Sequence, residues 1–177
     1  MIIWIDGAYG VGKSTLAEKL HEVLPNSFIF DAENVGNAVR DNMPQRVYYS
    51  ETFEGYPLWF HICNELLTEL SNRFDGVILV PMTLMQRDSF PKFADPLRGQ
   101  GIEIVHVLLE SSKKVIHDRI LERGENEDCW CMRHIDECLS AQQRFEDVIR
   151  VQSVGQTADE LAEEVMERLQ LSMEKEK

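Results

Sequence analysis

The segment at residues 7–14, "GAYGVGKS", constrains this chain more than any other part of the sequence. It matches G-x-x-x-x-G-K-S/T at each fixed position: Gly7, Gly12, Lys13 and Ser14. The apolar run "IIWI" before it is typical of a buried strand, and "STLAEKLHEVL" after it has apolar residues at helical spacing. A glycine loop between a strand and a helix is the context in which this motif cradles phosphate groups.

The residue types of the motif fit that chemistry. Glycines let successive backbone N–H groups turn toward an anion, and the following helix adds its own N-terminal N–H donors. We expect Lys13 to reach the β- and γ-phosphates and the Ser14 hydroxyl to be a Mg²⁺ ligand. A dinucleotide fingerprint is excluded because Thr15 stands where its third glycine would be. The sequence predicts that Mg·ATP is bound by Gly7, Ala8, Tyr9, Gly10, Val11, Gly12, Lys13, Ser14 and Thr15.

Composition narrows the class of protein further. The 177 residues, 44% of them hydrophobic, predict one domain over residues 1–177, ending in a short polar tail at about 171–177. The net charge of −13 argues against a nucleic-acid groove. The sequence contains neither a signal peptide nor a membrane-spanning stretch, so we expect a cytoplasmic protein; the oligomeric state is not indicated.

Apolar runs of strand type alternate with helical patterns along the chain. This alternation predicts an α/β fold with a five-stranded parallel sheet and helices on both faces. The expected strands lie at 2–5, 27–31, 76–80, 102–109 and 147–152. The expected helices lie at 14–24, 32–40, 58–70, 86–101 (broken or kinked near Pro91), 111–124, about 133–146 and 157–170. Ligands of such sheets bind beyond the carboxyl ends of the strands.

Absent motifs favour a kinase of the nucleoside or shikimate type among proteins with this loop. The chain has no N-K-x-D guanine motif, and its third strand ends in "VPMT" without an aspartate for magnesium. A carboxylate does follow the second strand: Asp31 is the predicted base for an acceptor hydroxyl, with Glu33 as its competitor. The alternative is that Asp31 only caps the following helix.

Further residues are predicted to contact the acceptor. Aromatic side chains gather after the acceptor-side helix, where they would suit a nucleobase or an acyl chain, or else pack in the interior: Tyr48, Tyr49, Phe53, Tyr56 and Trp59. The complete set of predicted substrate residues is Asp31, Glu33, Arg40, Tyr56, Trp59 and Thr83.

A lid is expected at about 119–138. Arg119 and Arg123 are one helical turn apart and would neutralise charge on the transferring phosphoryl group; the alternative is a solvated helix face. Arg133 is a weaker third candidate. The lid sequence "CWCMRHIDEC" could also supply four zinc ligands, although C-x-C is tighter than the usual spacing: Cys129, Cys131, His134 and Cys138. Free thiols are the other interpretation.

Several segments together resemble one known family. "IIWIDGAYGVGKS", "FDAENVGNAVR", "YPLW", "VILVPMT" and "IDEC" are similar, in order and spacing, to the ATP-binding tunicamycin-resistance proteins of bacteria. The similarity extends from Ile2 to about Leu169, and Asp6 stands where the family pattern predicts asparagine. The resemblance implies a nucleotide-kinase-like fold and a phosphotransferase associated with resistance to a uridine-containing antibiotic.

Two functions follow from these observations. The first is transfer of the ATP γ-phosphoryl group to a hydroxyl of a small molecule, which could be a nucleoside-type antibiotic such as tunicamycin. In that enzyme the predicted catalytic residues are Lys13, Asp31, Arg119 and Arg123. The second is ATP-dependent sequestration of such a molecule without chemistry. A nucleoside or nucleotide kinase is a third interpretation, although no D-G-x-P-R-like acceptor motif is present.

Overall fold

The computed structural model describes residues 1–46 and 49–170 of the chain. Tyr48 and the predicted tail at 171–177 lie outside the described residues. The five strands are β1 (Ile2–Gly7), β2 (Ser27–Ile29), β3 (Val77–Pro81), β4 (Ile104–Glu110) and β5 (Ile149–Gln152). The helices are α1 (Lys13–Val23), α2 (Ala32–Asp41), the 3₁₀ helix η1 (Phe53–Gly55), α3 (Pro57–Arg73), α4 (Ser89–Gly99), α5 (Lys113–Glu122), α6 (Trp130–Arg133), α7 (Ile135–Gln142) and α8 (Ala158–Arg168).

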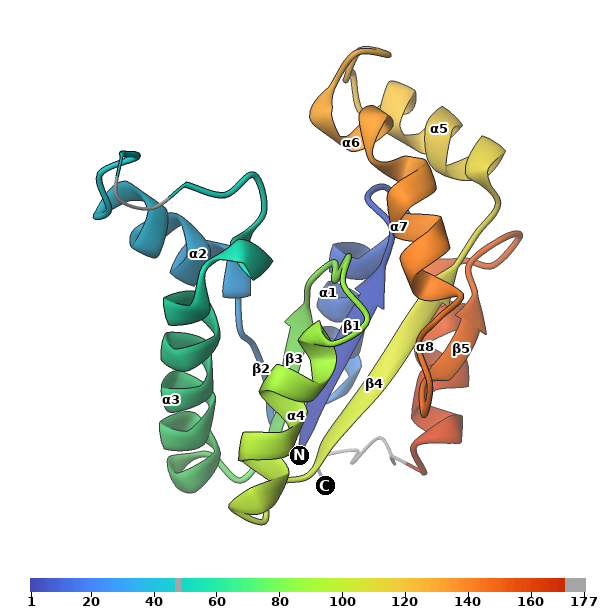
Figure 1. Cartoon of the computed structure of the whole chain (residues 1–177). Coiled ribbons are helices and arrows are strands. Elements are labelled where there is room, and N and C mark those ends of the chain that lie inside the picture. The colour runs from blue at the N-terminus through green and yellow to red at the C-terminus, as the bar shows by residue number, and fades with distance from the viewer. Residues whose placement is uncertain (47–48, 171–177) are drawn as a thin grey trace.

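The strands form one parallel sheet in the order β2-β3-β1-β4-β5. The predicted α/β fold with a five-stranded parallel sheet is therefore confirmed. Because all strands run the same way, their carboxyl ends meet at one edge of the sheet. The phosphate motif follows the central strand β1, while α2 and the segment α5–α7 lie beyond that edge on opposite sides (Figure 1).

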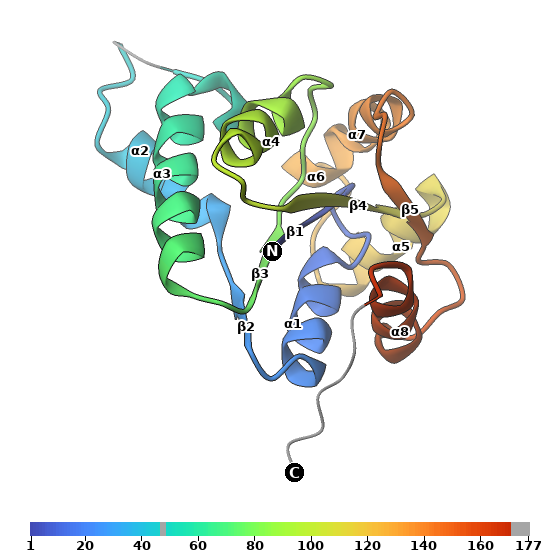
Figure 2. The same cartoon turned by 90° about the horizontal axis from the view of Figure 1, so that it is seen from below.

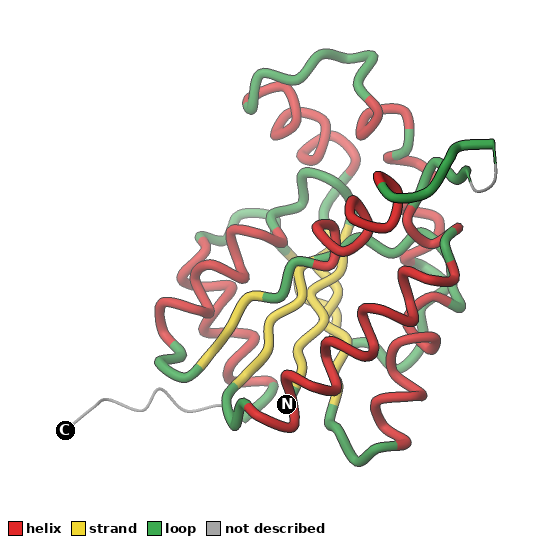
Figure 3. The backbone as a smooth tube through the Cα atoms, turned by 90° about the vertical axis from the view of Figure 1, so that its left-hand side faces the viewer, coloured by secondary structure: helices red, strands yellow, loops and turns green. Residues whose placement is uncertain are grey.

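The core has one layer on each face of the sheet. Side chains alternate along β1, so Ile2 and Trp4 pack on the face covered by α3 and α4, and Ile3 and Ile5 pack on the face covered by α1 and α8 (Figures 2 and 3). All four are fully buried. Burial of each such side chain contributes about 1.5–3 kcal/mol, which makes the central strand a firm base for the loop that follows it.

Helix α4 differs from its prediction. It is not broken near Pro91, because Pro91 lies in its first turn, where a backbone N–H is not needed within the helix. A second proline, Pro96, lies inside the helix and cannot donate to the Lys92 carbonyl. The Asn64 side chain of α3 donates to that carbonyl at 2.9 Å, so the missing helical bond is replaced by one between helices.

The predicted lid, at about 119–138, contains the end of α5, all of α6 and the start of α7. Helix α5 begins as expected, with the Ser112 hydroxyl accepting from the Val115 N–H, and ends before Gly124, which has φ 84°. The helix predicted at about 133–146 is shorter and spans Ile135–Gln142, because α6 forms a separate turn before it. No helix among the described residues is long and apolar enough to cross a membrane.

Candidate functional site

The loop after β1 has the backbone geometry of an anion nest. Gly10 has φ 81° and Gly12 has φ 112°, a region that side chains disfavour. A Cβ on Gly10 would also lie 2.8 Å from the side chain of Ile120 in α5, so the loop packs closely against the lid helix. Gly12 is the N-cap of α1, without a side-chain cap and with no acidic residue in the first turn. The first N–H groups of α1 are therefore available to an anion.

The Lys13 side chain folds back over this loop. Its ammonium donates to the Gly7 and Ala8 carbonyls at 3.0 and 3.1 Å. Burial lowers the pKa of Lys13, and the negative charge of Asp6 opposes that shift. A cation beside the free N–H groups at the start of α1 is placed to bind phosphate oxygens.

A cavity of about 700 Å³ surrounds this loop, and we call it the phosphate-loop cavity. Its size falls in the range of small-molecule sites. Its wall contains most of the predicted nucleotide-binding residues, and both lid arginines: Tyr9, Gly10, Val11, Gly12, Lys13, Ser14, Thr15, Leu16, Glu33, Pro81, Arg119, Glu122, Arg123, Glu125, Cys131, Gln156, Ala158 and Leu161. The nest, the uncapped helix and the ammonium fit the triphosphate of ATP, and the Ser14 hydroxyl on the wall fits a Mg²⁺ ligand.

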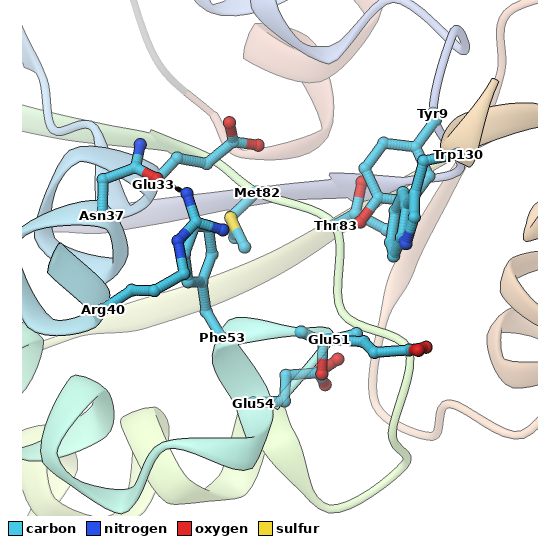
Figure 4. A pocket seen from close by; sticks show the side chains of 11 residues that line it. Tyr9, Glu33, Asn37, Arg40, Glu51, Phe53, Glu54, Met82, Thr83 and Trp130 are labelled. Carbon is cyan, nitrogen blue, oxygen red and sulfur yellow. Dashed lines mark hydrogen bonds between the residues drawn. The ribbon is translucent and has the colours of Figure 1, made fainter. Parts of the chain in front are cut away.

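A second cavity, of about 330 Å³, lies beside the first, and we call it the side cavity (Figure 4). Its wall comes from the phosphate loop, α2, the η1 segment, the turn after β3 and the lid: Tyr9, Glu33, Asn37, Arg40, Glu51, Thr52, Phe53, Glu54, Met82, Thr83 and Trp130. Tyr9 and Glu33 line both cavities. The two cavities therefore meet at a ring and a carboxylate beside the phosphate loop.

The two predicted acceptor carboxylates have different positions. Asp31 is the N-cap of α2: one carboxylate oxygen accepts the N–H groups of Glu33 and Asn34 at 2.9 and 3.1 Å. Asp31 lines neither cavity, whereas Glu33, the second residue of the helix, lines both. The geometry thus favours the capping interpretation for Asp31 and brings Glu33 to the site.

The other predicted substrate residues divide into two groups. Arg40 and Thr83 line the side cavity, and the Thr83 hydroxyl also donates to the Gly7 carbonyl at 2.9 Å. Tyr56 and Trp59 are 1% and 0% exposed and lie in the core on the α3 face of the sheet. The Trp59 indole donates to the Ala32 carbonyl at 2.8 Å, an interior contact that anchors α2. This corrects the prediction that Tyr56 and Trp59 contact the acceptor.

Glu54 is a site residue that the sequence analysis missed. It is 6% exposed, and its carboxylate accepts the N–H of Met85 at 3.0 and 3.1 Å and the N–H of Gln86 at 3.0 Å. Burial raises the pKa of Glu54, and the hydrogen bonds to its carboxylate oppose that shift. The segment around it has no periodic pattern, so a glutamate among neighbouring aromatic residues was the only available signal.

A buried pair, Asp6 and His106, lies next to the phosphate loop and holds its start in place. One Asp6 oxygen accepts the N–H groups of Gly7 and Leu84 at 2.6 and 3.0 Å, and the other lies 3.0 Å from Nε2 of His106. The His106 ring stacks on Phe90 with centroids 4.1 Å apart. Asp6 therefore connects the phosphate loop to β4 and to the turn after β3. The resemblance predicted asparagine at position 6.

The lid arginines have unlike surroundings. The Arg119 guanidinium donates to the Val11 carbonyl at 2.8 Å and to the Ser153 hydroxyl and carbonyl at 3.2 and 3.0 Å. It therefore braces α5 against the phosphate loop. Arg123 is half-exposed and lies 3.3 Å from Glu125, a surface ion pair of the kind that contributes little to stability. Arg133 is exposed and lines neither cavity.

The lid meets the phosphate loop through aromatic rings. Trp130 contacts Tyr9 edge to face, with centroids 5.0 Å apart, and stacks on His134 at 4.0 Å. The Cys129 sulfur accepts the Met132 N–H at the start of α6, and Cys138 is buried. Within residues 1–46 and 49–170, no three His, Cys, Asp or Glu side chains are placed to hold a metal ion. The cysteines of this part of the chain are free thiols.

Comparison with solved structures places the fold among kinases. The chain is similar to the tunicamycin resistance protein of Deinococcus radiodurans, with a TM-score of 0.79, 24% identity and 99% coverage of each chain. A sugar kinase from Janibacter sp. HTCC2649 has a TM-score of 0.71 and 18% identity, covering 97% of this chain and 95% of that one. A gluconokinase from Sinorhizobium meliloti 1021 has a TM-score of 0.65 and 17% identity, covering 95% and 90%.

These likenesses confirm the predicted fold type, that of the P-loop kinases. No curated protein matches the sequence. The model of the AAA domain family matches residues 2–147, which is most of the chain, and the chain belongs to that family.

Proposed function

We propose that the protein is an ATP-dependent phosphotransferase that acts on a hydroxyl of a small molecule. The observation that carries this proposal is the meeting of the two cavities at Tyr9 and Glu33. One cavity has the donors for a triphosphate, and the other, of about 330 Å³, has room for an acceptor beside it. A kinase needs these two sites adjacent, so that the acceptor hydroxyl is in line with the γ-phosphorus.

When bound, Mg·ATP supplies the γ-phosphoryl group and the metal charge that offsets its oxygens. Lys13 and the N–H groups of the loop hold the phosphates, and the Ser14 hydroxyl is the expected metal ligand. Glu33 accepts the proton of the acceptor hydroxyl as its oxygen bonds to phosphorus and the bond to ADP breaks. Arg123 contacts the transferring group when the lid closes, while Arg119 holds the lid helix against the loop.

Glu33 takes the role of base in this proposal in place of Asp31. A base must come within hydrogen-bond reach of the proton that it removes. The Asp31 carboxylate already caps α2 and lines neither cavity, so its contribution is to fix the start of the helix that carries Glu33.

The acceptor class follows from the fold neighbour and from the wall of the side cavity. A nucleoside-type antibiotic such as tunicamycin offers hydroxyls together with a planar base, and the side cavity offers the rings of Tyr9, Phe53 and Trp130. ATP-dependent sequestration of the same ligand without transfer is the alternative. It is favoured by the half-exposed position of Arg123, which leaves no guanidinium fixed on the transferring group.

Formation of a new product distinguishes phosphoryl transfer from sequestration. We expect the protein to convert tunicamycin or a uridine derivative to a phosphorylated species in the presence of Mg·ATP, as read by mass spectrometry. Lys13→Ala should lose both product and ATP affinity while keeping its circular dichroism spectrum. Retention of full ATP affinity in that variant would remove the phosphate-loop assignment, and ligand binding without product would favour sequestration.

A further inference from the structure

We propose that the side cavity selects acceptors by charge, taking a hydroxylated molecule that carries a protonated amine and discriminating against carboxylates and phosphates. This inference rests on the proposed function, because it concerns the acceptor of that reaction. It goes further by naming a charge preference and the residues that set it.

The charges on the cavity wall are unbalanced. Among the described residues that line the side cavity, three carry carboxyl groups, Glu33, Glu51 and Glu54, and one carries a guanidinium, Arg40. In Figure 4, Glu51 and Glu54 lie together at one side of the cavity, away from Arg40. Within residues 1–46 and 49–170, neither Glu33 nor Glu51 forms an ion pair.

Arg40, the basic side chain among the described residues of this wall, is already engaged. The Arg40 guanidinium donates to the Asn37 side chain and lies 5.3 Å from the centre of the Phe53 ring. An anionic acceptor would thus meet uncompensated carboxylates and would have to take Arg40 from these contacts. Like charges in a cleft of reduced dielectric cost binding energy, so the wall disfavours such an acceptor.

The same wall suits a cation. Glu54 is held in place by the Met85 and Gln86 N–H groups, so its carboxylate is fixed before a ligand arrives. The rings around the cavity also accept cations: Lys13 lies 5.5 Å from the Tyr9 centroid, and Arg40 lies 5.3 Å from the Phe53 centroid. An ammonium group near Glu51 and Glu54 would leave the rest of the acceptor directed toward Glu33 and the phosphate loop.

The two cavities therefore differ in charge. The wall of the phosphate-loop cavity is balanced, with three basic and three acidic side chains: Lys13, Arg119, Arg123, Glu33, Glu122 and Glu125. The side cavity has carboxylates in excess. This difference would keep ATP and other phosphates out of the acceptor position and would hold a cationic acceptor next to the anionic donor.

A matched set of sugars tests the preference. We choose 6-amino-6-deoxyglucose, glucose and glucuronate, which differ at one carbon and are positive, neutral and negative at neutral pH. Their affinities are measured by calorimetry with Mg²⁺ and a non-hydrolysable ATP analogue. We expect the affinity for the amine to exceed the affinity for glucuronate by about tenfold or more, with glucose between them. Several partly screened charges on the wall would each change the affinity by a factor of a few.

Variants at Glu51, an exposed position on the wall of the side cavity, distinguish the effect of charge in the cavity from the effect of the net charge of the protein. Glu51→Gln should reduce the spread between the three sugars, and Glu51→Lys should abolish or reverse it. Glu65→Lys changes the net charge equally at an exposed position of α3 outside both cavities, and should leave the spread unchanged.

Equal affinities, the reverse order, undetectable binding of the amine, or a spread that Glu65→Lys alters as much as Glu51→Lys would each overturn the inference. The proposed function fails on a different observation. If ATP replaces the analogue and a neutral nucleoside is phosphorylated without any charge preference, the function stands and this inference is lost. If the charge order holds but no acceptor is ever phosphorylated, the preference stands and the function is lost.

Discussion

At the scale of single residues, Asp31 and Glu33 show how much of the site could be predicted from the sequence. Both follow the second strand, and the sequence placed a carboxylate there correctly. Which of the two faces the ligand depends on where α2 begins, because a helix rotates by about 100° per residue. Asp31 proves to be the cap, a role that its residue type equally predicts, so that Glu33 projects over the cavities.

This difference gives the first prediction. Glu33→Gln keeps the size and polarity of the side chain but removes the proton acceptor, so it should lower the rate of phosphoryl transfer by about 10²-fold or more while sparing ATP affinity. Asp31→Asn retains an oxygen that can cap α2 and should lower the rate far less. Turnover and ATP titration are measured on both variants. A larger loss in Asp31→Asn would return the role of base to Asp31.

Asp6 gives a prediction on stability. Asp6→Ala would leave the buried partners of its carboxylate, His106 among them, without a hydrogen bond, and should cost about 3–5 kcal/mol in unfolding free energy. Asp6→Asn should stay within about 1 kcal/mol of the wild type, because its oxygen can still accept from Gly7 and Leu84 while the His106 ring changes tautomer. Urea unfolding measures both. Equal losses in the two variants would show that the pair, and not the backbone contacts, sets the stability.

Titration of Glu54 should make the stability of the protein depend on pH. Its folded pKa is raised by burial, so in the window above the usual value of 4.5 the native state binds more proton than the unfolded state. Stability should therefore fall as pH rises from that value through the raised pKa, and the contribution of Glu54 should be most favourable at the acidic end. Glu54→Gln should flatten this decline, as measured by urea unfolding at several pH values. An unchanged slope would mean that other groups produce it.

At the scale of elements, the sequence predicted the strands and most helices because their patterns are local. Continuous apolar runs indicated β1, β3 and β4, and the Thr157–Glu160 capping box predicted for α8 is present. The segment from Asn42 to Tyr56 was not predictable in this way. Its η1 turn is held by Glu54 contacts with residues more than thirty positions away, and local patterns carry no record of such contacts.

Substitution of the two lid arginines should affect ATP affinity differently. Arg119→Ala removes three hydrogen bonds that join α5 to the phosphate loop and to Ser153, so it should weaken ATP binding together with turnover. Arg123→Ala removes only a surface ion pair in this state and should lower turnover much more than ATP affinity. Steady-state kinetics with ATP titration distinguishes them. An effect of Arg123→Ala on thermal stability alone would support a solvated helix face.

At the scale of the whole molecule, the parallel sheet explains why residues from distant segments share one site. The turns after β1 and β3 and the start of α2 after β2 meet at the same edge, and α5–α7 cover it (Figure 1). The sequence could predict this edge from the order of strands and helices. It could not predict which aromatic residues reach the edge, since Trp59 and Phe53 belong to one apolar cluster and only Phe53 borders the cavity.

The central claim is that the two adjacent cavities serve phosphoryl transfer between small molecules. The most direct measurement follows the γ-phosphoryl group of labelled ATP with the wild type and with Lys13→Ala. We expect label to leave ATP and to appear in the acceptor in a one-to-one ratio with ADP, and Lys13→Ala to transfer almost none. Label that stays in ATP, or is released only as inorganic phosphate while the small molecule is recovered unchanged, would contradict the proposed phosphoryl transfer.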